Sequence, residues 1–237
     1  MNLTKELLHQ IADQGISINK RAQLRCKLAK QLEEAGNYEA ARAAMGELWQ
    51  RVGERPTLGS LDQETTGEVL LRAGALTGWI GSAKQIAGSQ EAAKDLITES
   101  ISIFSSLANV EKLSAAQTDL AVCYWREGAF DDARVILQQV VDRLAYTESE
   151  TRAVALLRRG IVEGSALRFY DALRIFEEAA PLMEKSGDPS LRGKFHNCFG
   201  TVLKELAVAE QRQEYIDRAL IEFTAANFSR TARLDHF

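Results

Sequence analysis

The fold is indicated most clearly by residues 24–45, which read LRCKLAKQLEEAGNYEAARAAM. The first half fits an amphipathic helix that ends at Gly36, because glycine readily takes the left-handed backbone that terminates helices. Asn37 can then cap a second amphipathic helix. The apolar faces hold Leu24, Leu28, Ala29 and Leu32 in the first helix and Tyr38, Ala41, Met45 and Leu48 in the second. This stretch therefore predicts two antiparallel helices joined by a tight turn.

Residues 120–137 repeat the pattern in the form LAVCYWREGAFDDARVIL. Both segments have a small residue where the helices approach, a glycine at the turn, an aromatic residue after it and an alanine where the helices cross. The matched positions are Ala29 and Ala121, Gly36 and Gly128, Tyr38 and Phe130, and Ala41 and Ala133. The pattern resembles the tetratricopeptide repeat (TPR), a helix pair that stacks against its neighbours along the chain.

Two further units follow the pattern with longer helices. Gly74 precedes Ala93 by 19 residues, and Gly200 precedes Ala219 by the same number, whereas the equivalent residues of the 120–137 unit are 12 apart. Both units thus gain seven residues, which is about two helical turns. An equal gain in two units predicts an ordered elongation of the helix pair.

A fifth unit lies around Gly160, with Leu167 in place of the turn glycine and Arg159 where the TPR family prefers a large apolar residue. The five crossing positions are 45, 47, 39 and 40 residues apart, longer than the roughly 34 residues of the standard repeat. The chain therefore resembles a larger-period TPR-like protein, as found in bacterial regulatory proteins. HEAT- or armadillo-type pairs are the structural alternative.

The resemblance implies an all-α fold, a right-handed superhelical solenoid of about five antiparallel helix pairs. We expect one domain over residues 1–237, with an amphipathic helix at residues 3–13 covering the first unit. The repeat units are predicted at residues 20–52, 64–110, 112–146, 150–187 and 189–228. Residues 51–61, with two glycines and a proline, form the clearest expected loop.

Composition agrees with helices and excludes several classes of function. Apolar residues make up 46% of the 237 residues, and there are only three prolines. The net charge of −4 gives no cationic field for nucleic acid. The sequence shows no secretory signal and no run of roughly 20 apolar residues that would span a membrane. An odd count of three separated cysteines favours free thiols and a cytoplasmic location.

We find no pattern for catalysis. The three histidines, His9, His196 and His236, show no metal-ligand spacing. The glycines from Gly74 to Gly88 fit no phosphate-loop motif, and close helix packing explains them better. We therefore expect no enzyme activity and no catalytic, cofactor-binding or metal-binding residues.

The TPR resemblance implies that the first helix of each pair lines a concave groove. Carried over residue by residue, the predicted peptide-binding positions are Lys30, Arg72, Val122, Trp125, Arg126, Leu157, Arg158, Ile161, Lys194 and Asn197. The same helix faces also include Cys26, Glu33, Leu71, Trp79, Thr118 and Lys204. The three arginines are expected to face the groove because a guanidinium is rarely buried without a partner.

These positions predict a scaffold or sensor module that binds a peptide or protein with acidic flanks. The regulatory part of a larger bacterial regulator is one setting for such a module. The alternative is a self-associating structural protein that forms a homo-oligomer through the ends of the solenoid. A third hypothesis, an enzyme or small-molecule sensor, requires a cluster of convergent polar groups that the sequence does not show.

Overall fold

The computed structural model describes the backbone of residues 3–234 and the side chains of residues 5–229. Within that range the chain forms helices and connecting segments and no strand, which confirms the all-α prediction. The chain divides into two compact units, the first ending at Glu127 and the second beginning at Gly128. This boundary falls inside the predicted repeat at residues 112–146, so its two helices belong to different units.

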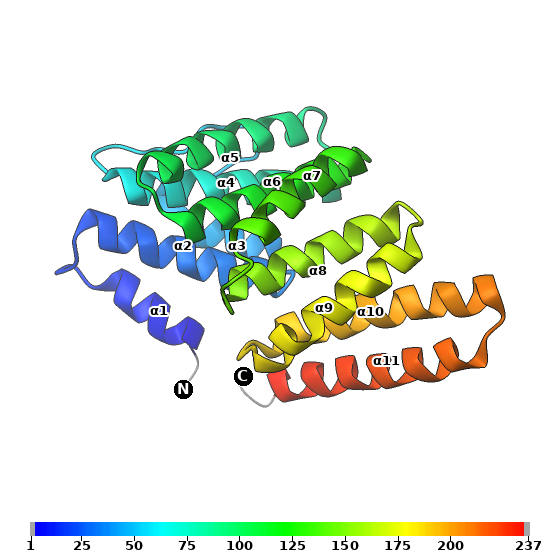
Figure 1. The fold of residues 1–237 in the computed structure, drawn as a ribbon. Coiled ribbons are helices and arrows are strands. Elements are labelled where there is room, and N and C mark those ends of the chain that lie inside the picture. The colour runs from blue at the N-terminus through cyan, green and yellow to red at the C-terminus, as the bar shows by residue number, and fades with distance from the viewer. Residues whose placement is uncertain (1–2, 235–237) are drawn as a thin grey trace. The chain divides into compact units, whose positions relative to one another are not determined.

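The first unit consists of a short helix followed by the first helices of three repeats and the second helices of two. Its elements are α1 (Leu3–Ala12), α2 (Ile18–Glu34), α3 (Tyr38–Met45), the 3₁₀ turn η1 (Gly46–Leu48), α4 (Gln63–Ala83), α5 (Ser89–Ser106) and α6 (Val110–Arg126). Helix α1 packs on α2 through Leu7, as expected of a covering helix. Helix α4 packs against both α2 and α6 (Figure 1), so the first helices of the repeats are neighbours.

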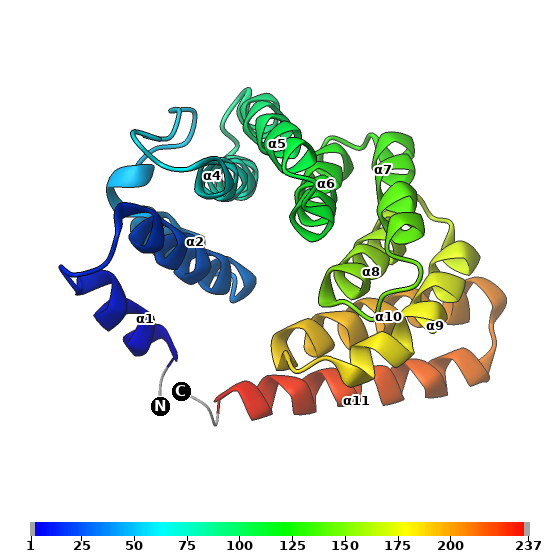
Figure 2. The same cartoon turned by 60° about the vertical axis from the view of Figure 1, so that its left-hand side comes forward.

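The second unit contains α7 (Phe130–Arg143), α8 (Glu150–Ser165), α9 (Phe169–Lys185), α10 (Pro189–Glu210) and α11 (Gln213–Leu234). Helices α10 and α11 run side by side in opposite directions (Figures 1 and 2). Helix α11 continues beyond residue 228, where the last repeat was predicted to end. His236 lies outside the described residues.

The predicted turn chemistry is confirmed at the first pair. Gly36 has φ +78° and ends α2, while the Asn37 side chain accepts a hydrogen bond from the Ala40 amide and caps α3. Leu167 takes the same role after α8 with φ +59°, although it is not a glycine. A left-handed backbone strains a leucine, so this turn is held by the packing on either side of it.

The two elongated pairs share one crossing geometry. A methyl group on Gly74 would lie 2.7 Å from Cγ1 of Ile97, and one on Gly200 would lie 2.9 Å from the ring of Phe223. In both pairs the contacted residue is 23 positions beyond the glycine, so the elongation is ordered and equal, as predicted. Only glycine lets these helices approach so closely.

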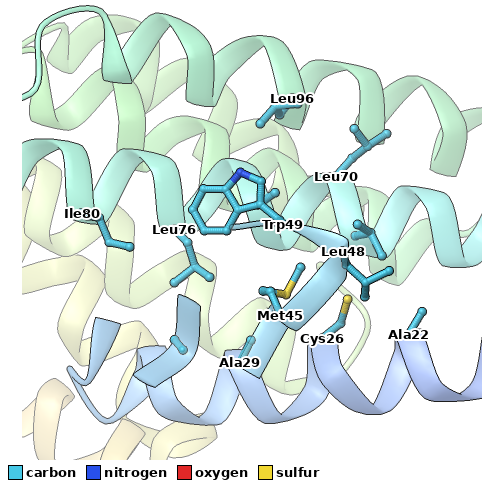
Figure 3. Packing of buried hydrophobic residues seen from close by; sticks show 13 residues of the cluster. Ala22, Cys26, Ala29, Met45, Leu48, Trp49, Leu70, Leu76, Ile80 and Leu96 are labelled. Carbon is cyan, nitrogen blue, oxygen red and sulfur yellow. The ribbon is translucent and has the colours of Figure 1, made fainter. Parts of the chain in front are cut away.

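The core of the first unit is centred on Trp49, which follows η1 and is 2% exposed. Figure 3 shows its indole lying against α4 beside Leu76, with Met45 and Cys26 between the neighbouring helices. The indole N–H donates to the carbonyl of Glu54 at 3.0 Å. This bond ties the predicted loop at residues 51–61 to the helical core.

Candidate functional site

Three charged side chains form a row across α2, α4 and α6. Arg72 donates a hydrogen bond to the Glu33 carboxylate, and the two side chains are only 8% and 10% exposed. Burial opposes the charge on Arg72, but the carboxylates of Glu33 and Asp119 more than offset this and raise its pKa. The expectation that Arg72 faces an open groove is therefore wrong, because Glu33 lets it be buried as an ion pair.

A second row lies two helical turns farther along α4 and α6. The Tyr38 ring stacks on Trp79 with centroids 5.4 Å apart and planes 9° apart. On Trp79 the Arg126 guanidinium carbon lies 3.8 Å from the ring centroid. Each of these two helices contributes a residue seven positions after its member of the first row, which returns the chain to nearly the same helix face.

Between the two rows lies a small pocket, bounded by α4 and α6. Its lining residues are Ala75, Gly78, Trp79, Asp119, Val122, Cys123 and Arg126. Val122 is 7% exposed and forms part of the apolar wall. Trp125 is half-buried beside the pocket, with its ring centroid 5.8 Å from the Arg126 guanidinium carbon. We call Trp79, Val122, Trp125 and Arg126 the Trp79–Arg126 surface.

The geometry of the Trp79–Arg126 surface suits recognition of an anionic group. A guanidinium stacked on an indole loses side-chain freedom and keeps its N–H donors in one plane, where they can bind a carboxylate. Half-buried tryptophan and arginine side chains are also the residues that contribute most to protein interfaces. Cys123 adds no reactivity, because burial raises the pKa of its thiol to about 12.

In the second unit, the predicted residues gather where α8 and α10 pack together. Arg158 and Lys194 both lie close enough to Cys198 to act on its thiol, whose pKa burial raises and these two cations lower. Ile161 is half-buried, and Asn197 is exposed on α10. The arrangement is a basic and polar surface.

Several predicted positions are taken up by packing. Leu157 is 2% exposed and belongs to the core of the second unit, so its predicted place in an open groove is corrected. The buried Val122 can contribute only the pocket wall. Cys26, Leu71 and Thr118 are also buried. Lys30 is exposed and lies 3.7 Å from Glu34 in a surface ion pair.

Sequence reasoning did not assign Tyr38 or Asp119 to the site. Tyr38 was assigned only to the turn, and Asp119 was not singled out. The signal available was the shared spacing of seven from Arg72 to Trp79 and from Asp119 to Arg126. What the spacing could not give was the pairing between helices that lie more than 40 residues apart.

The described residues hold no group of three histidine, cysteine or acidic side chains arranged to bind a metal. Among the helices described, none is long and apolar enough to cross a membrane. Helix α4, the most apolar of the long ones, carries Glu64, Glu68 and Arg72.

Comparison with solved structures identifies the fold. BtubC (BKLC) from P. vanneervenii superposes with a TM-score of 0.61 at 15% identity, over 94% of this chain and 88% of that one. A variant of a kinesin light chain-like protein from Podosopora anserina, with nearly identical TPR-like repeats, gives 0.51 at 18% identity, over 92% and 99%. The chain has a TPR-like helical repeat fold. No protein-family model matches the sequence, and no curated protein is significantly similar to it.

The TPR-like assignment confirms the predicted helix-pair repeat over the HEAT or armadillo alternative. At these identities the likeness concerns the fold, so function rests on the surface of this chain.

Proposed function

We propose that this TPR-like chain is a protein-interaction module, a scaffold or sensor that binds a peptide or protein segment on the Trp79–Arg126 surface. The observation that supports the proposal is the Arg126 guanidinium lying 3.8 Å over the Trp79 ring at the edge of a pocket. A side chain held in this way is ordered before a partner arrives, so binding loses little entropy there.

The expected partner is an acidic peptide with an apolar residue beside the acid. Arg126 can donate two parallel hydrogen bonds to a carboxylate. Val122 and the half-buried Trp125 offer apolar contact next to it. In the second unit, Arg158, Lys194 and Asn197 are a separate candidate surface for anionic groups.

The narrower setting is also a proposal. Cys26, Cys123 and Cys198 are free thiols, which supports a reducing compartment such as the cytoplasm. The long repeat period supports a place as the regulatory part of a larger bacterial regulator. We propose no catalytic role, since TPR-like folds generally serve as scaffolds.

Affinity capture from native lysate tests the proposal with the variants Arg126→Glu and Arg158→Glu. Arg126→Glu is expected to reduce recovery of the bound protein by about 10-fold or more, because it places a carboxylate where the partner brings its own. Arg51→Glu is the matched control, since Arg51 is 78% exposed on the loop after η1. Circular dichroism verifies that each variant folds.

If Arg126→Glu folds and recovers the same proteins at the same strength as Arg51→Glu, the Trp79–Arg126 surface is not the binding site. Loss with Arg158→Glu alone would move the site to the second unit.

A further inference from the structure

Helix α11 carries a continuous apolar face on the side turned away from α10. Ile216, Leu220, Ile221 and Phe228 are 42%, 60%, 67% and 73% exposed. The opposite side of the helix packs on α10 through Tyr215 and Ala219, which are buried. Exposed apolar patches of this kind usually mark interaction surfaces.

The elongated α4–α5 pair shows how unusual this face is. Gly74 meets Ile97 and Gly200 meets Phe223 at the same spacing, so residues of α5 and α11 correspond at a constant offset. By that offset Lys94 corresponds to Leu220, Asp95 to Ile221 and Ser102 to Phe228. Three polar positions of α5 are therefore apolar in α11.

Only part of this face would be covered by a helix stacked in the manner of α6. Lys94 is reached by α6: its ammonium lies 5.0 Å from the Tyr124 ring centroid and 2.9 Å from the Glu127 carboxylate. Asp95 and Ser102 stay exposed to solvent on α5 although α6 is present. Continuing the repeat therefore accounts for Leu220 and leaves Ile221 and Phe228 unexplained.

The charges around the face allow it to meet an identical surface. Between Ile216 and Phe228 the ionisable side chains other than Asp217 are engaged within the unit. Arg218 pairs with Glu177 at 2.8 Å, and Glu222 with His196 at 2.7 Å. A face so poor in charge creates little repulsion against its own copy, and homodimer interfaces are the more apolar class.

The area is also sufficient for a dimer. From their exposed fractions, the four side chains present on the order of 400 Å² of apolar surface per copy. Two copies would bury on the order of 800 Å² from these side chains alone, and their neighbours would bring the total towards the roughly 1,200 Å² of stable interfaces.

We propose that α11 packs against α11 of a second copy of this chain, as an antiparallel helix pair about a two-fold axis. A two-fold contact closes on itself, so the product is a dimer and not a filament. The middle of the face, near Leu220 and Thr224, lies at the axis. The proposal does not depend on the Trp79–Arg126 surface.

Sedimentation velocity of the 237-residue chain, from about 1 to about 200 µM, tests the proposal. The wild type is expected to pass from monomer to dimer. Leu220→Glu should raise the dissociation constant about 100-fold or more, because each dimer would bury two carboxylates. The triple variant Leu220→Lys, Ile221→Asp and Phe228→Ser, which copies the α5 face, should remain a monomer.

Val135→Glu is the matched control, since Val135 is 56% exposed on α7 and lies outside the face. Helical content by circular dichroism shows that the variants keep α11. A Thr224→Cys variant should form a disulfide-linked dimer under mild oxidation, because two-fold symmetry brings this position close to its copy. A monomeric wild type throughout the range overturns the proposal, as does a Leu220→Glu variant that dimerises like Val135→Glu. Arg126→Glu is expected to dimerise normally.

Discussion

The α4–α5 and α10–α11 pairs have the same internal geometry and different surfaces. A glycine lets the helices cross, and a large side chain 23 residues later fills the space beside it. On the first helix, however, Glu68, Arg72 and Trp79 correspond to Lys194, Cys198 and Glu205. The aromatic and cationic row of the first unit is therefore not repeated in the second.

This difference shows which positions the repeat architecture constrains. Crossing residues and buried faces are set by close packing, which tolerates little change in volume. Exposed positions are free to vary, so each unit can carry its own chemistry. In this molecule the first unit presents the Trp79–Arg126 surface, and the second presents an apolar helix face.

The largest expected effect concerns thiol reactivity. Burial raises the pKa of Cys26 to about 12, and that of Cys123 to about 12 as well. At pH 8 this lowers the thiolate fraction about a thousandfold relative to a free cysteine. Cys198, which is half-buried, should be labelled first. Timed labelling with a thiol reagent and mass spectrometry checks the order, and fast labelling of all three cysteines in the folded protein would contradict it.

The next effect concerns the buried ion pair of the first unit. Glu33→Ala leaves the Arg72 charge in the interior and should lower the free energy of unfolding by about 3 kcal/mol. Urea denaturation followed by circular dichroism measures it. Lys30→Ala is the control on the same helix, since a surface ion pair contributes about 0.5 kcal/mol or less. Equal effects of the two substitutions would mean that Arg72 is not buried.

A smaller effect should appear at the shared crossing. Gly74→Val and Gly200→Val each add volume where no space exists and should cost about 2 kcal/mol. Gly74→Val is the more damaging, because the backbone carbonyl of Ala93 lies 3.1 Å from the added carbon and cannot rotate away. Thermal unfolding of both variants checks this. Gly78→Ala is the control, because its nearest neighbours are at 3.4 Å or more.

The smallest effect is a gain in stability. Leu167→Gly relieves the left-handed backbone at a side chain that is 75% exposed, so little packing is lost. The gain should be about 0.5 kcal/mol, since the added freedom of the unfolded chain offsets part of it. Gly128→Ala, at the equivalent turn with φ +80°, should lose about 1 kcal/mol. Chemical denaturation compares the two, and the same sign for both would contradict the equivalence.

Local signals were enough to predict most of the fold. Gly36 and Asn37 define a turn by their own backbone and side-chain preferences, and the spacing from Gly74 to Ala93 reveals the longer helices. The site was harder to predict. The burial of Arg72 depends on Glu33, which is 39 residues away in the sequence, and the contact between Trp79 and Arg126 depends on how α4 and α6 pack. A single helix face does not contain that information.

Oxidative footprinting of the three tryptophans, with and without the captured partner, tests the proposed recognition surface most directly. Trp49 is 2% exposed and serves as the unreactive reference. Oxidation of Trp79 and Trp125 should fall several-fold when the partner is bound, because it covers the half-buried rings beside Arg126. Unchanged oxidation of both rings in a fully formed complex would show that the partner binds elsewhere on the chain.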